Sequence, residues 1–178
     1  MHFDDHTIEL AVVGPATGVR IGKRFSIEGA RLTIRCSLEN PGHAALPHLF
    51  KMDSQFRGNL LDAVDEQPWP TSIDLSRCRD QTTRSNEVVY VSDLPEGWCG
   101  ITDTKAGSWF RIDDPRDVFP YCWIFMSYGA WRYHNVVVLE LCSNYPRDLN
   151  EAIATGKAAA LAPSSTTEFQ LQVSVGAR

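Results

Sequence analysis

The sequence predicts an all-β protein, and three observations support this fold class. From Thr7 to Val91, short runs rich in Val, Ile, Leu, Phe and Thr are broken at close intervals by Gly, Pro or Asn. Apolar and polar residues alternate within several of these runs, as they do in strands with one buried face. One segment alone carries the boundary signals of a helix. Since 178 residues suffice for one hydrophobic core, we expect a single domain over residues 1–178.

The clearest strand pair lies between Arg24 and Leu38. Phe25 and Ile27 alternate with polar neighbours, and a turn follows around Glu28-Gly29. Apolar residues then return at every second position, which predicts a second strand with the same buried face. These positions are Leu32, Ile34, Cys36 and Leu38.

Turn residues separate the strands expected in the next segments. Asn40-Pro41-Gly42 ends the second strand, because Pro cannot donate to a ladder and Gly tolerates turn dihedrals. A new strand is expected to start near Leu46 and to continue past Asp53. Residues from Asp65 to Asn86, which include two prolines and many polar side chains, are expected to form a long loop.

Downstream, β-branched and aromatic residues predict six further strands. These are expected over Glu87–Ser92, Trp98–Thr102, Trp109–Ile112, Phe119–Tyr128, His134–Leu141 and Glu168–Val175. A short helix is expected near Asp148 to Thr155, because Asp148 can cap its N-terminus with Glu151 three residues later. Gly156 followed by Lys157 supplies its stop signal.

Composition excludes several classes of function. The net charge is −5 and Lys and Arg are scattered, so nucleic acid is not an expected partner. The apolar runs are far shorter than the roughly 20 residues that cross a bilayer, so no membrane span is expected. The N-terminus lacks the basic and apolar stretches of a secretory signal, which predicts a cytoplasmic protein. The five cysteines are widely spaced without a Cys-x-x-Cys pair, which argues against a disulfide framework or zinc site.

The second half of the chain carries a specific combination of motifs. Phe119–Arg132 holds Pro-Tyr, a Trp within an expected strand, and a Gly-Ala-Trp turn. Val137–Ala152 follows with a strand ending in Leu-Glu, a Tyr-Pro turn and the short helix. These segments, the tail from Gly156 to Pro163 and, more loosely, Ile34–Phe56 resemble the aldose 1-epimerase (galactose mutarotase-like) family in its C-terminal portion.

The resemblance implies a β-supersandwich. Members of that family have a considerable N-terminal β region ahead of this passage, so we expect a sandwich that lacks those strands. Such a sandwich would leave sheet edges and apolar faces uncovered, and proteins usually pair or cover such edges. We therefore expect a homodimer or a larger homo-oligomer.

The resemblance also implies a chemistry, the interconversion of sugar anomers without a cofactor. Opening the hemiacetal requires a base for the anomeric hydroxyl and an acid for the ring oxygen. Glu140 matches the family's catalytic carboxylate and is expected to be the base. Asp53 stands where the family has a catalytic His. It could act as the acid if burial near Glu140 raised its pKa; otherwise it is an ordinary surface Asp. As substitutes for the missing His, His134 is too far along its strand to pair directly with Glu140, and His48 has the opposite strand parity from Asp53.

An aromatic and basic cluster is the candidate sugar-binding surface, because aromatic rings stack on sugar faces and Arg donates to hydroxyls. It comprises Trp123, Tyr128, Trp131 and Arg132. Trp123 fits a core position equally well. No metal site is expected, since Asp113-Asp114 next to Pro115 more often make a turn.

Three hypotheses follow for the function. The first is an aldose 1-epimerase-like isomerase that acts on an aldose or sugar derivative. The second is a non-catalytic carbohydrate-binding or structural remnant of the same fold, motivated by the replaced His. The third is a truncated reading frame that assembles only as an oligomer.

Overall fold

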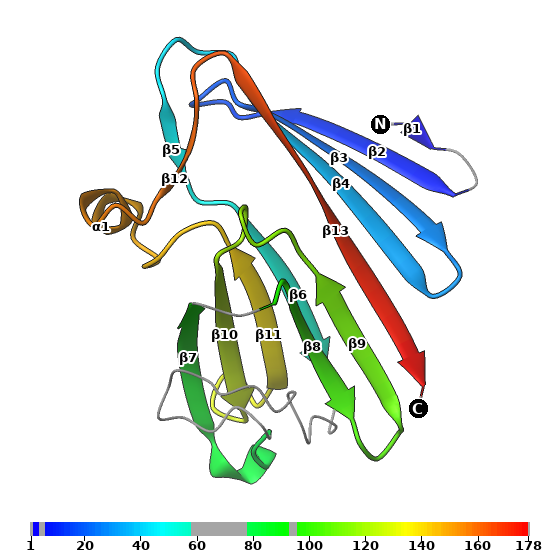
Figure 1. The fold of residues 1–178 in the computed structure, drawn as a ribbon. Coiled ribbons are helices and arrows are strands. Elements are labelled where there is room, and N and C mark those ends of the chain that lie inside the picture. The colour runs from blue at the N-terminus through cyan, green and yellow to red at the C-terminus, as the bar shows by residue number, and fades with distance from the viewer. Residues whose placement is uncertain (1, 4–5, 58–77, 93–95, 178) are drawn as a thin grey trace.

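The computed structural model describes residues 2–3, 6–57, 78–92 and 96–177, and for residues 2–3 and 53–57 it describes the backbone alone. Within these residues most of the chain forms strands (Figure 1). The strands are β1 (His2–Phe3), β2 (Thr7–Val13), β3 (Arg20–Glu28), β4 (Arg31–Asn40), β5 (Leu46–His48), β6 (Lys51–Arg57), β7 (Ser85–Ser92), β8 (Trp98–Asp103), β9 (Ser108–Asp113), β10 (Tyr121–Tyr128), β11 (Asn135–Cys142), β12 (Ala159–Leu161) and β13 (Ser165–Ala177).

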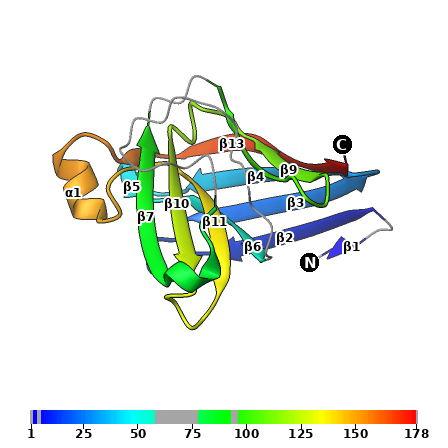
Figure 2. The ribbon, with the colours of Figure 1, turned by 90° about the horizontal axis from the view of Figure 1, so that it is seen from below.

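Two antiparallel sheets make the body of the protein. The large sheet has seven strands in the order β1-β2-β3-β4-β13-β9-β8, so that the late strand β13 lies between β4 and β9. The small sheet has four strands in the order β6-β11-β10-β7. Figure 2 shows the small sheet crossing the large one at one end. The all-β sandwich expected from the sequence is confirmed.

The expected hairpin at residues 24–38 is confirmed and is longer at both ends. It comprises β3 and β4, with Glu28 paired to Arg31 across the turn. Gly29 in that turn has φ +58°, a left-handed conformation that glycine adopts at little cost. The apolar residues that alternate along β4, such as Ile34 and Cys36, are buried, as the period-2 pattern requires.

The hydrophobic core lies between the two sheets. The large sheet contributes alternate residues such as Ile34 and Leu171, and the small sheet contributes Ile124 and Leu139, all at most 6% exposed. Along β10 and β11 the residues facing this core occupy every second position. The intervening residues therefore project from the opposite face of the small sheet.

The expected strand near Leu46 is interrupted. It divides into β5, which pairs with β12, and β6, which pairs with β11. The sequence gives no indication of β12. The expected long loop of residues 65–86 falls partly outside the described residues; its described part contains a short 3-10 helix over Gln81–Thr83 and ends where β7 begins at Ser85.

The other expected strands are confirmed with shifts of a few residues at their ends. β10 starts at Tyr121 rather than Phe119, because Phe119 donates its N–H to the carbonyl of Pro115 and Pro120 has no N–H for a ladder. The expected helix is confirmed as α1 (Leu149–Ala154). The side chain of Asp148 accepts a 3.0 Å hydrogen bond from the Glu151 N–H, as a capping residue does.

All five cysteines are free, and Cys36, Cys99, Cys122 and Cys142 are buried. Among the described residues, no helix has both the length and the apolar character needed to cross a lipid bilayer.

Candidate active site on the small sheet

A single row of residues that are paired in register runs across the four strands of the small sheet. Trp123 on β10 lies opposite Glu140 on β11 and opposite Tyr90 on β7. On the other side of β11, the backbone of Asp53 in β6 lies opposite Glu140. We call Tyr90, Trp123, Glu140 and Asp53 the central row. The ladder register thus places both sequence-predicted catalytic residues at adjacent positions.

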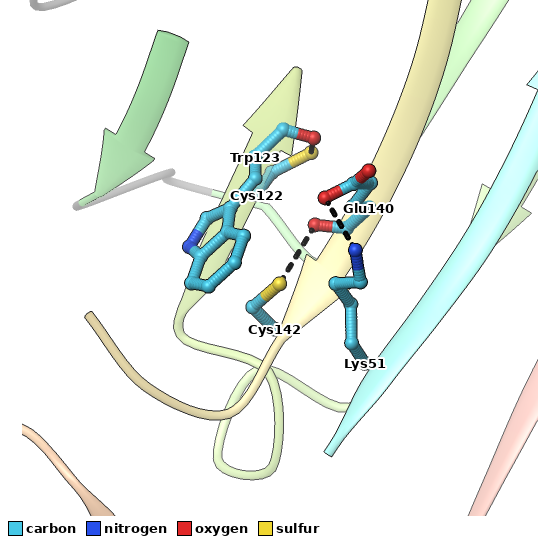
Figure 3. Close-up of polar contacts among 5 residues, drawn as sticks. All are labelled: Lys51, Cys122, Trp123, Glu140 and Cys142. Carbon is cyan, nitrogen blue, oxygen red and sulfur yellow. Dashed lines mark hydrogen bonds and ion pairs between the residues drawn. The ribbon is translucent and has the colours of Figure 1, made fainter. Parts of the chain in front are cut away.

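The carboxylate of Glu140 is fixed by an ion pair. Its Oε2 lies 3.0 Å from Nζ of Lys51, and the Glu140 and Lys51 side chains are 14% and 29% exposed (Figure 3). Lys51 pairs in register with Cys142, two residues beyond Glu140, so that the two charged side chains meet diagonally across the β6–β11 ladder. Oε1 of Glu140 makes no hydrogen bond to the described residues. One carboxylate oxygen is therefore held, and the other can accept a hydrogen bond from a ligand.

The indole of Trp123 presents an unused donor beside this ion pair. Trp123 is 3% exposed, and its Nε1–H finds no acceptor within the described part of the chain. Nζ of Lys51 lies 5.7 Å from the centre of the same ring (Figure 3). An unsatisfied buried N–H costs about 1–3 kcal/mol, so a bound hydroxyl or a water that accepts from it would be stabilised.

Three tyrosines extend the indole into a surface that we call the aromatic wall, which consists of Tyr90, Tyr121, Trp123 and Tyr145. Tyr90 meets Trp123 edge to face at 5.3 Å and Tyr145 at 5.2 Å between ring centres. Tyr121 and Tyr145 lie 5.9 Å apart. Tyr90 is 38% exposed, so part of the wall faces solvent. Aromatic surfaces beside a few polar groups are typical of sites that bind sugar rings.

Trp131 and Arg132 lie at the end of the same face, in the turn between β10 and β11. The ring of Trp131 packs edge to face on Phe125, 6.0 Å between centres, and Phe125 shares the face of Trp123 two residues away. Trp131 is 43% exposed, and the guanidinium of Arg132 lies 5.9 Å from its ring centre. The structure therefore brings both residues to the rim of this face rather than to Glu140 itself.

Tyr128 lies elsewhere. Its spacing of five residues from Trp123 puts it on the opposite face of β10, in the core, where it is 2% exposed. Burial raises the pKa of its hydroxyl well above the usual range. The structure does not bring Tyr128 together with the other sequence-predicted site residues.

The residues considered as substitutes or metal ligands also lie apart from the central row. His48 is in β5, where burial lowers the pKa of its imidazole, and His134 stacks on Trp131 at 5.2 Å. Asp113 pairs with Arg111, and burial raises the pKa of Asp114 to about 6. No group of three His, Cys, Asp or Glu residues in the described part of the chain is arranged to hold a metal ion.

Sequence reasoning did not select Lys51, Tyr90, Tyr121 or Tyr145. A signal existed for two of them. Lys51 is two residues from Asp53 in one strand, and Tyr121 is two residues from Trp123, so each pair shares strand parity. Tyr90 and Tyr145 reach the site through the β7–β10 register and a ring contact, which the linear sequence does not show.

Comparisons with known proteins support the fold. No model of a protein family matches the sequence, and neither does any curated protein. Solved structures do match over nearly the whole chain. An aldose 1-epimerase candidate from Escherichia coli K12 matches with a TM-score of 0.76 and 18% identity, over 100% of this chain and 68% of that one.

Two other solved structures match the fold over nearly the whole chain. A protein from Synechocystis sp. PCC 6803 matches with a TM-score of 0.72 and 14% identity, over 99% of this chain and 64% of that one. A galactose mutarotase-like protein from Lactobacillus casei ATCC 334 matches with a TM-score of 0.70 and 11% identity, over 99% of this chain and 72% of that one. The chain therefore has the galactose mutarotase-like sandwich fold and spans about two thirds of the length of these proteins.

Proposed function

We propose that the protein binds a sugar over the aromatic wall and interconverts its anomers, with Glu140 as the general base. The observation that carries this proposal is the register of the central row, which sets Glu140 between Trp123 and Asp53. A pyranose that stacks on the wall would bring a ring hydroxyl to Oε1 of Glu140, while the Trp123 N–H donates to a second oxygen. The fold is shared with an aldose 1-epimerase candidate and with a galactose mutarotase-like protein, which adds support.

Asp53 is the proposed acid. Opposite positions in an antiparallel ladder bring two Cα atoms to about 4.5–5.5 Å, so one sugar ring can reach both residues. The base would take the proton of the anomeric hydroxyl and the acid would protonate the ring oxygen, after which the open chain closes on either face. The roles reverse on closure. No cofactor takes part in this chemistry.

A specific observation favours the second candidate function, binding of carbohydrate without turnover. Lys51 already engages one oxygen of Glu140, which ties up part of the proposed base. In that case Glu140 and Lys51 together accept from and donate to sugar hydroxyls, and the aromatic wall supplies the stacking surface. No proton is moved.

One pair of measurements separates the two functions. Polarimetry on freshly dissolved α-anomers of several hexoses measures the mutarotation rate, and ligand-observed NMR measures binding of the same sugars. The proposed isomerase accelerates mutarotation above the rate in buffer. Saturation transfer to a sugar without acceleration supports the binding function, and the absence of both would refute the two together.

A further inference from the structure

The inner face of the large sheet, the one that contacts the core, continues beyond the cover of the small sheet. Figure 2 shows the small sheet over one end of the large sheet and not over the end near the C-terminus. On this inner face Ile8, Leu10 and Val12 of β2 are 40%, 39% and 58% exposed, and Ile27 of β3 is 59% exposed. These residues share strand parity with core residues, since Leu10 pairs with Lys23, which pairs with the buried Cys36.

The outer edge of the large sheet lies beside this apolar surface. β2 pairs with β3 along its whole length, but on its other side β1 pairs only with Ile8 and Glu9. Within the described residues, the stretch Leu10–Val13 has no strand on that side. We call it the apolar edge. Proteins normally protect such edges with Lys, Pro or a bulge, and this one carries none of these.

Two exposed valines show how this edge would be covered. Val12 and Val13 are 58% and 57% exposed, and as consecutive strand residues they project from opposite faces of the sheet. A partner packed on one face would cover only one of them. A strand added edge-on contacts both and also pairs with the exposed backbone groups of β2.

We propose that the apolar edge binds the same edge of a second copy of this chain, forming one continuous antiparallel sheet across a two-fold axis near Ala11 and Val12. The stretch is uncharged, so two antiparallel copies oppose no like charges, although each copy carries a net charge of −5. The symmetry is isologous, as in most homodimers, and it places the inner faces of both copies on the same side.

The area involved sets the expected affinity. A few paired residues and their neighbouring side chains bury less than the roughly 800 Å² per partner of a standard interface. Dissociation is therefore expected in the micromolar range, and the dimer fraction should depend on concentration. This proposal is independent of the catalytic function.

Sedimentation velocity from about 1 to 100 μM tests the proposal, because this range brackets a micromolar dissociation constant. We expect the unmodified protein to shift from monomer to dimer, and Val12→Lys to stay monomeric at every concentration with an unchanged circular dichroism spectrum. Ile153→Lys is the matched control, since Ile153 is 47% exposed on α1 and should leave dimerisation unchanged. A monomeric unmodified protein, or a Val12→Lys variant that dimerises as strongly, would overturn the proposal.

Cross-linking tests the geometry of pairing. A disulfide forms when two Cα atoms lie about 4.4–6.8 Å apart, so Ala11→Cys or Val12→Cys should give a covalent dimer under mild oxidation. Val88→Cys is the control, because Val88 is 49% exposed on β7 in the small sheet and should stay monomeric. A dimer by sedimentation that neither Ala11→Cys nor Val12→Cys traps would show that a different surface, or a different partner strand, is used.

Discussion

Nζ of Lys51 lies 3.0 Å from Oε2 of Glu140, and this ion pair joins the edge strand β6 to its neighbour β11. The pair lies beside the buried indole of Trp123. Because both side chains are mostly buried, the pair is more than a surface contact and holds one carboxylate oxygen in a defined place. A sugar that approaches Glu140 meets a carboxylate, an ammonium and an aromatic surface together.

Replacing Glu140 by Gln should lower the mutarotation rate about 10²- to 10⁴-fold, the usual contribution of a general base. The amide keeps the shape and a hydrogen bond but cannot take the proton. Polarimetry on the purified variant measures the effect. Glu168→Gln, at an exposed position on β13, is the control and should retain the full rate. An unaltered rate for Glu140→Gln would exclude the proposed base.

Asp53→Asn should also lower the rate, and the pH profile should lose its alkaline limb. The physical reason is that the acid must be protonated to serve the ring oxygen, and an amide does not titrate. Rates measured from pH 4 to 9 show the profile. Asp117→Asn, at an exposed position, should change neither rate nor profile. Identical profiles for Asp53→Asn and the unmodified protein would mean that Asp53 is a bystander.

Trp123→Phe separates binding from stability. It removes a buried N–H that has no acceptor among the described residues, so the free energy of unfolding should stay within about 1 kcal/mol of the original value. Sugar affinity should fall about 2- to 10-fold with the loss of one hydrogen bond. Urea unfolding and NMR titration measure the two quantities. Trp109→Phe on β9 should leave affinity unchanged, and equal affinity in both variants would show that the indole N–H does not contact the sugar.

Gly129→Ala should destabilise the protein by more than about 3 kcal/mol, beyond the ordinary cost of a point substitution. Gly129 has φ +89°, and an added Cβ would collide with the backbone carbonyl oxygen of Gln81. Gly29→Ala is the matched control, because Gly29 has φ +58° and open space around it, and should cost about 1–2 kcal/mol. Thermal and urea unfolding give the comparison. Equal losses in the two variants would show that the backbone contact is easily relieved.

Asp114 makes stability depend on pH. Burial raises the pKa of its carboxyl to about 6 from 3.8, so the folded state holds this proton more tightly than the unfolded state. Its contribution to stability is complete below pH 3.8 and is lost as pH rises through about 6. Asp114→Asn should remove that loss and raise stability at pH 7 by on the order of 1 kcal/mol, after solvent screening of a partly exposed group. Urea unfolding at pH 4 and pH 7 measures the free energy of unfolding, with Asp117→Asn as the control. A gain in stability that is the same at both pH values would contradict the raised pKa of Asp114.

Sequence alone predicted much of the fold because the long strands carry dense period-2 patterns. The β3–β4 hairpin and the β10–β11 pair are such cases. β5 and β12 have three residues each, too few for periodicity, and their pairing joins Leu46 to Leu161. No local signal encodes a contact of that range.

The candidate site was predictable where strand parity was used and less so elsewhere. Glu140 and Asp53 came from a resemblance, and the ladder sets their backbones opposite each other. Tyr128 is close to Trp123 in sequence, but the odd spacing within one strand sends their side chains to opposite faces. Lys51 shares the parity of Asp53 and could have been chosen by the same rule.

The place of β13 between β4 and β9 has a consequence for how the protein is made. A ribosome delivers β1–β4 and β8–β9 long before β13, so the two halves of the large sheet emerge with no strand between them. Both β4 and β9 then expose a full edge until residues 165–177 leave the exit tunnel. During that interval the unpaired edges are open to misassembly, and a codon-level pause ahead of Ser165 would lengthen their exposure.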